Sequence, residues 1–205
     1  MIAKRIVCCY NKSAMLQKLT ILGPGLLGGS MGLAARHHKV AKRVVIWARR
    51  HEAADEAWKL GAADETVTDL QKAVADAELV VLATPIGVMR TLVEQFKPAL
   101  PDGCVVTDVG SVKYPVVTAL TAALSGKARF VGSHPMAGSE QSGIEAAKRD
   151  LFEGAVCIVT PREDTDKTAL QLVHDFWKAL GCSVQTLAPH AHDEIVAREI
   201  GRAHV

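Results

Sequence analysis

The chain has 205 residues, of which 49% are hydrophobic and 22% charged, and its formal net charge is +2. This composition is typical of a globular domain, and so small a charge argues against nucleic acid or an acidic membrane as a partner. No apolar run reaches the roughly 18 residues that a membrane span needs. The five cysteines form no C-x-x-C pair, which favours free thiols in the cytoplasm over a disulfide framework or a metal site.

The first convincing strand follows Met15, the second methionine of the chain. We therefore interpret residues 1–14 as an extension or as a start codon placed too early. This segment carries a few basic residues but lacks the long apolar stretch of a signal peptide.

Strand and helix patterns alternate along the rest of the chain. Short apolar runs predict strands at residues 18–23, 43–48, 77–85, 103–111, 129–135, 155–161 and 182–188. Helical patterns occupy residues 26–38, 51–61, 86–100, 114–124 and 166–181. Buried strands separated by helices predict an α/β fold, a doubly wound, mostly parallel Rossmann-type sheet with helices on both faces.

The loop after the first strand has the G-x-G-x-x-G pattern of dinucleotide-binding sites. In such a loop the first glycine permits a tight turn, the second lets a pyrophosphate approach, and the third lets helix and strand pack closely. The phosphates then meet free N–H groups at a helix N-terminus. We expect residues 15–188 to form a dinucleotide-binding domain; the alternative is a glycine-rich turn without a ligand. The expected contacts are Gly23, Pro24, Gly25, Leu26, Leu27 and Gly28.

The end of the second strand bears on which dinucleotide binds. An NAD site usually has an acidic residue about twenty positions after the loop, on the ribose 2′-hydroxyl. Here that position is Ala48, followed by Arg49 and Arg50. Guanidinium groups bind a 2′-phosphate that a carboxylate would repel. We therefore expect NADP as the preferred cofactor and NAD as the alternative, in which case both arginines are simply solvated.

Two residues at the end of the third strand, Thr84 and Pro85, are expected to face the cofactor. Ligands of such folds bind at the carboxyl ends of the strands. The simpler interpretation is that the proline only ends the strand.

Several segments together resemble the prephenate/arogenate dehydrogenase family of tyrosine biosynthesis. They are the glycine loop with its following Gly-Ser, "TDVGSVK", "GSHPMAGSEQSG" with "LF" further on, "VTP" and "HDEIVA", and they extend from about Leu19 to Ala197. The resemblance implies an enzyme in which NAD(P)+ takes a hydride from a cyclohexadienyl ring. The ring carboxylate leaves as CO2, which yields 4-hydroxyphenylpyruvate from prephenate or tyrosine from arogenate.

The same resemblance implies roles for single residues. His134 would be the catalytic base, and an imidazole with a reference pKa near 6.5 suits removal of a hydroxyl proton. Ser111 would contact that histidine, and hold its tautomer, or contact the nicotinamide region. Asp108 would lie on the cofactor side. Lys113, Ser139 and Glu140 would line the substrate side. Bracing of the loop by Asp108, a solvated Lys113 and helix capping by the last pair are the alternatives.

The resemblance stops near the end of the chain. Residues 189–205 are expected to begin an all-helical domain that forms a homodimer and completes the substrate pocket. Residues 199–205 are hypothesised to be non-native, because Ile200 to Val205 is what ATC GGA AGA GCA CAC GTC would encode, a string that matches a common sequencing adapter. His190 and His192 suggested a metal pair, but no third ligand lies near them in the sequence, so no metal is expected.

Two other functions remain open from the residues alone. Another NADP-linked reductase of similar architecture would have the same glycine loop and arginines. A cofactor-binding fragment without turnover is the second alternative.

Overall fold

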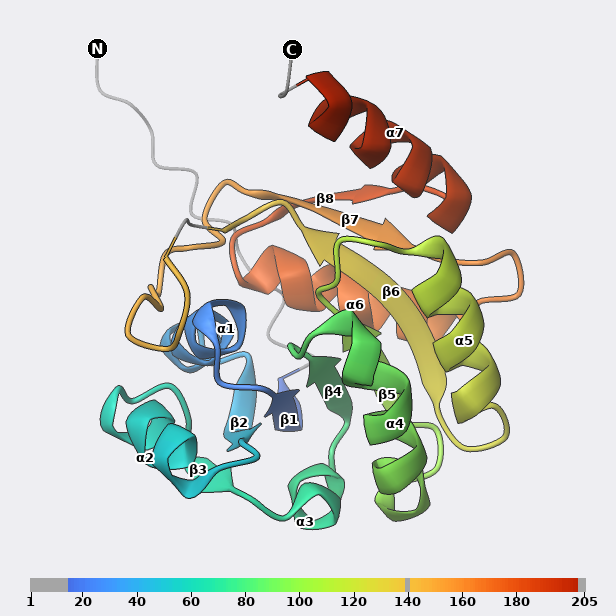
Figure 1. Ribbon diagram of the computed structural model, residues 1–205. Helices are drawn as coiled ribbons and strands as arrows, with labels where there is room; N and C mark the ends of the chain where they lie inside the picture. Colours follow the sequence, from blue (N-terminus) through green and yellow to red (C-terminus); the bar gives the residue numbers. More distant parts are fainter. Residues whose placement is uncertain (1–14, 139–140, 203–205) are drawn as a thin grey trace.

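An eight-stranded sheet runs through the structure (Figure 1), a computed structural model that describes residues 15–138 and 141–202. Its strands are β1 (Leu16–Leu22), β2 (Ala41–Trp47), β3 (Glu65–Val67), β4 (Leu79–Leu82), β5 (Val105–Asp108), β6 (Arg129–Pro135), β7 (Val156–Thr160) and β8 (Ser183–Thr186). Their spatial order is β3-β2-β1-β4-β5-β6-β7-β8. Only β6 and β7 pair antiparallel; every other pair of described neighbours is parallel.

Helices cover both faces of this sheet. They are α1 (Leu26–His37), α2 (His51–Lys59), α3 (Leu70–Val74), α4 (Ile86–Phe96), α5 (Tyr114–Leu124), α6 (Lys167–Ala179) and α7 (Pro189–Arg202), with a 3-10 turn η2 (Lys97–Ala99) after α4. Alternate strand residues face opposite layers: Leu79 and Val81 pack with α1, α2 and α6, whereas Val80 and Leu82 pack with α3, α4 and α5. The predicted doubly wound α/β fold is therefore confirmed.

Three local features differ from the sequence-based expectation. Strand β3 and helix α3 were not predicted, because three and five residues are too few for a readable periodicity. Residues 141–154 form bends and turns, so no described helix begins directly after position 140 that the preceding residues could cap. The predicted extension 1–14 lies outside the described residues, as do residues 203–205 at the end of the chain.

Small residues let α1 pack closely on its neighbours. A Cβ at Gly28 would lie 1.9 Å from the Gly23 carbonyl oxygen, and one at Gly32 would lie 2.1 Å from that of Ala62. A Cβ at Gly29 would lie 2.9 Å from Ala147. The glycines thus bring the helix against the loop after β1, against the backbone at Ala62 and against the 141–154 segment. No described helix is long and apolar enough to cross a membrane.

Candidate active site

The glycine loop forms a cradle at the N-terminus of α1. Gly23 has φ +109°, a conformation that L side chains rarely adopt, and its N–H donates to the Trp47 carbonyl at 3.0 Å. Gly25 is the N-cap and offers no side-chain cap, and a Cβ built there would meet nothing within 4 Å. No acidic residue occupies the first turn. Free N–H groups beside open space suit a pyrophosphate, so the residues present fit a dinucleotide.

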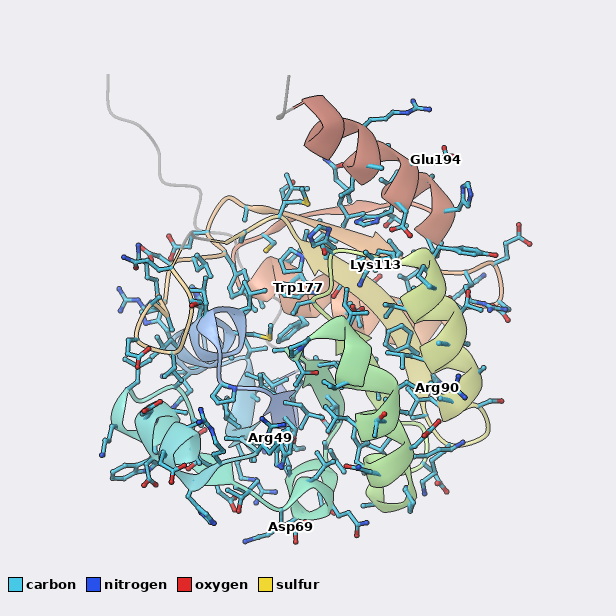
Figure 2. The ribbon with its side chains drawn as sticks, in the orientation of Figure 1. Arg49, Asp69, Arg90, Lys113, Trp177 and Glu194 are labelled. Carbon is cyan, nitrogen blue, oxygen red and sulfur yellow. The ribbon has the colours of Figure 1, made fainter. Side chains whose placement is uncertain are left out.

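The predicted arginines follow the strand next to this loop. Leu22 of β1 pairs with Trp47 of β2, so Arg49 and Arg50 come just beyond the same edge of the sheet. Figure 2 labels Arg49 at this edge. Ala48 before them is buried, whereas both arginines are exposed. Neither guanidinium makes a hydrogen bond or an ion pair with any described residue. They are available to a ligand.

Thr84 and Pro85 follow β4, the other neighbour of β1. The Thr84 methyl group lies 3.1 Å from where a Cβ of Gly23 would be. The buried Oγ1 of Thr84 has no hydrogen-bond partner among the described residues. Pro85 is exposed and is the N-cap of α4. Thr84 therefore borders the cradle, and contact of Thr84 or Pro85 with the cofactor stays a prediction.

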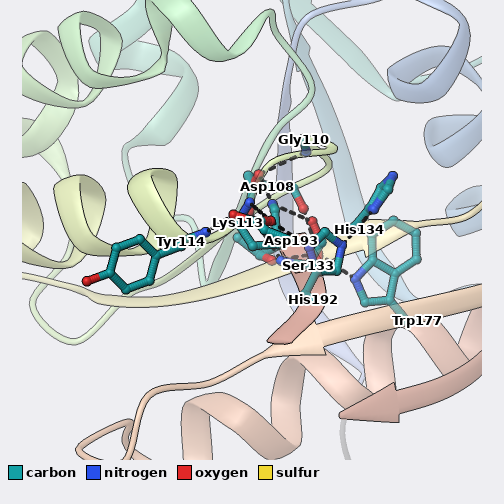
Figure 3. Close-up of polar contacts among 10 residues, drawn as sticks. Asp108, Gly110, Lys113, Tyr114, Ser133, His134, Trp177, His192 and Asp193 are labelled. Carbon is teal, nitrogen blue, oxygen red and sulfur yellow. Dashed lines mark hydrogen bonds and ion pairs between the residues drawn. The ribbon is translucent and has the colours of Figure 1, made fainter. Parts of the chain in front are cut away.

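A buried ion pair organises the neighbouring loop, residues 109–113. The Lys113 ammonium donates to Asp108 Oδ2 and, at 2.8 Å, to the Ser133 carbonyl oxygen (Figure 3). Asp108 also accepts the N–H groups of Gly110 and Ser133, at 2.8 and 3.2 Å. Both charged side chains are 0% exposed. The geometry favours a bracing role for Asp108 and Lys113, and contact of either with a ligand stays a prediction.

His134 lies at the carboxyl end of β6, directly after Ser133. Its Nδ1 is 2.9 Å from Nε2 of His192 in α7, and His192 Nδ1 is 2.8 Å from Asp193 Oδ1. Asp193 in turn accepts the backbone N–H groups of Lys113 and Tyr114 at 2.7 and 2.9 Å. Two histidines and a carboxylate thus form a continuous series of hydrogen bonds beside the buried ion pair.

The surroundings of His134 and Asp193 shift the pKa values of both side chains. Burial, together with the nearby His192 and Lys113, lowers the pKa of His134 to about 4, although Asp193 acts in the opposite direction. Burial alone would raise the pKa of Asp193, but the two backbone N–H groups and His192 outweigh it and lower that pKa. At neutral pH His134 is therefore an uncharged base, and Asp193 is a carboxylate.

The predicted catalytic pair is not joined in the structure. Ser111 is exposed and makes no hydrogen bond with His134, whose Nδ1 contacts His192 instead. The predicted substrate residues Ser139 and Glu140 lie outside the described residues.

The sequence does not predict His192 as a member of this site, because beside His190 it indicates only a candidate metal ligand. No metal-binding group of three His, Cys, Asp or Glu side chains occurs within residues 15–138 and 141–202. The "HDEIVA" segment was the signal that could have identified it.

Comparison with known proteins gives consistent results. A family model described as "Prephenate dehydrogenase, nucleotide-binding domain" matches residues 31–186. Prephenate dehydrogenase of Bacillus subtilis (strain 168) is 34% identical over 184 residues, which are 89% of this chain and 50% of that protein. The chain thus spans about half the length of this curated relative.

Two solved structures are also similar. Prephenate dehydrogenase from A. aeolicus, in complex with hydroxyphenyl propionate and NAD+, has a TM-score of 0.83 at 33% identity, over 90% of this chain and 64% of that one. Synechocystis arogenate dehydrogenase has a TM-score of 0.81 at 30% identity, over 88% of this chain and 63% of that one.

The buried ion pair predicts a large stability effect. Lys113→Met leaves the Asp108 carboxylate buried without its partner, which should lower the free energy of unfolding by about 3–5 kcal/mol. Urea denaturation measures this. The control is Lys127→Met, which removes a surface pair whose Asp102 carboxylate is 90% exposed and should have a much smaller effect. Equal losses in the two variants would contradict the importance of the buried pair.

The lowered pKa of His134 predicts a dependence of stability on pH. Between the folded pKa of about 4 and the unfolded value near 6.5, the unfolded chain binds more protons. The free energy of unfolding should therefore fall as the pH drops from 6.5 to 4, and less steeply in His134→Gln. Denaturation at several pH values measures both slopes. Above pH 6.5 the two curves should run parallel; identical slopes below it would refute the assignment.

Proposed function

The chain belongs to the prephenate dehydrogenase family, and from this premise we propose that it forms the nucleotide-binding part of an enzyme for the oxidative decarboxylation of prephenate or arogenate. The observation that carries the proposal is His134, an uncharged, half-buried imidazole at the same sheet edge as the glycine cradle. We expect the complete protein to act in the cytoplasm as a homodimer. The dimer would form through the helical domain that residues 189–205 are expected to begin.

His134 is suited to handle one proton in this reaction. Bound NAD(P)+ supplies the acceptor for the hydride that leaves the ring carbon bearing the hydroxyl group. As the hydride leaves, His134 takes the hydroxyl proton, and that carbon becomes a carbonyl. The electron pair of the bond to the departing CO2 then enters the ring and makes it aromatic. His134 returns the proton to the ring oxygen, so no net proton is consumed.

The environment of His134 supports this role as a base. A histidine with a pKa of about 4 is almost fully deprotonated at neutral pH and can accept a proton whenever substrate binds. Ser139 and Glu140 come shortly after it in the chain, and we propose that they contact the substrate. Ser111, exposed in the loop that Asp108 and Lys113 brace, is proposed to contact the substrate or the nicotinamide.

We further propose that the enzyme prefers NADP+. Arg49 and Arg50 are exposed, unpaired among the described residues and adjacent to the glycine cradle. No acidic residue precedes Glu52 in this loop to bind a 2′-hydroxyl or repel a phosphate. Two guanidinium groups therefore determine the charge where the adenosine ribose would lie.

The substrate is tested with the complete gene product that contains this chain. We expect CO2 release and reduced cofactor in equal amounts with prephenate, arogenate or both. His134→Asn should lower kcat by at least about 100-fold, the contribution typical of a general base, without abolishing cofactor binding. No turnover with either substrate would refute the proposal and favour a different NADP-linked reductase.

The cofactor preference is tested on the chain itself by calorimetric titration. Arg49→Ala/Arg50→Ala should weaken NADP+ binding about 10- to 100-fold, because charge-assisted hydrogen bonds to the 2′-phosphate are lost, and should leave NAD+ binding nearly unchanged. Arg43→Ala, an exposed arginine nearer the start of β2, is the matched control. Equal affinity of the unmodified chain for both cofactors would contradict the preference.

A further inference from the structure

The hydrogen bonds that link His134, His192 and Asp193 have a defined donor and acceptor at each step (Figure 3). Asp193 is a carboxylate and can only accept, so His192 Nδ1, at 2.8 Å from its Oδ1, must carry the proton. If Nδ1 carries the only ring proton of His192, its lone pair lies on Nε2. That lone pair accepts from His134 Nδ1, at 2.9 Å, which must therefore be an N–H. The remaining nitrogen of His134, Nε2, is left with a lone pair.

We propose that His192, oriented by Asp193, is a positioning residue that holds His134 in its Nδ1–H tautomer and so makes Nε2 the proton acceptor. This inference rests on the proposed function, because it specifies which nitrogen of the proposed base receives the substrate proton. No described residue hydrogen bonds to His134 Nε2, so nothing in this part of the chain competes for that lone pair.

The position of His192 is fixed from several sides. Its side chain is 0% exposed, and its ring meets that of His134 edge-on, with centroids 5.1 Å apart. Asp193 is held by the N–H groups that begin α5, at Lys113 and Tyr114. The carboxylate that orients His192 is therefore anchored to the loop braced by the buried ion pair. Supporting hydrogen bonds and burial of this kind keep an active-site imidazole in one tautomer and one orientation.

The arrangement also assigns separate tasks to the two ends of the His134 ring. Nδ1 contacts His192, whereas Nε2 has no hydrogen bond to a described residue and is available to the ligand. On this inference His192, rather than Ser111, holds the tautomer, because His192 contacts Nδ1 of His134.

Tautomers are read directly by long-range 1H–15N correlation spectra of the chain labelled with 15N-histidine, recorded at neutral pH. We expect His134 to show a protonated Nδ1 and an unprotonated Nε2. His192→Phe removes the acceptor, and His134 should then shift toward the Nε2–H tautomer. His192→Gln places an amide oxygen near the position of the lost Nε2, and should restore the Nδ1–H form. His190→Phe, an exposed position on the same helix, is the control and should change nothing.

The outcomes separate the inference from the proposed function. An Nε2–H tautomer of His134 in the unmodified chain would overturn the inference, whatever the enzyme turns over. So would a His192→Phe variant that is folded by its amide spectrum and keeps the Nδ1–H form. In the complete protein, His192→Phe should lower kcat at least tenfold with little change in KM, and His192→Gln should recover most of the loss. An Nδ1–H tautomer in a protein without dehydrogenase activity would refute only the proposed function.

Discussion

The buried ion pair between Asp108 and Lys113 is the interaction on which the rest of the site depends. Removing two charges from water costs several kcal/mol per ion, and only good geometry with further hydrogen bonds offsets this cost. Here the carboxylate accepts from Gly110, Ser133 and Lys113, and the ammonium reaches a second acceptor, the Ser133 carbonyl. The pair thereby joins the end of β5, the loop before α5 and the end of β6.

Ser133 extends this network into the core and so determines where His134 stands. Its hydroxyl donates to the Asp108 carbonyl at 2.6 Å and accepts from Trp177 Nε1 of α6 at 3.0 Å. His134 is the next residue, and its backbone cannot move without disturbing these buried bonds. Its ring is held separately, by His192 of α7. Backbone and imidazole are thus fixed by different elements, which is the preorganisation that proton transfer requires.

The glycines at the start of α1 show how one pattern serves two purposes. At Gly28 and Gly29 a side chain would collide with the Gly23 carbonyl and with Ala147, so these glycines permit packing. At Gly25 a Cβ would meet nothing, so this glycine keeps space open where the helix N-terminus presents free N–H groups. The cradle therefore depends on tight packing at one residue and on vacant space at another, three positions apart.

Features that depend on neighbouring residues can be predicted from the sequence. Alternating strand and helix patterns, the glycine loop with Arg49 and Arg50 behind it, and the place of His134 at the end of a strand could all be read from local spacing. The exceptions, β3 and α3, were too short to show a period.

Which side chains come into contact from distant parts of the sequence depends on the tertiary structure. His192 is 58 positions from His134, and Asp193 is 80 from Lys113, so no local pattern could pair them. The burial of Lys113 could not be predicted either, because in the sequence it is an ordinary lysine at the start of a helix. Periodicity reports which side of an element is buried, whereas hydrogen-bond partners are set by how distant elements pack. That packing brings His192 of α7 to His134 of β6 and so links His134, through His192, to Asp193.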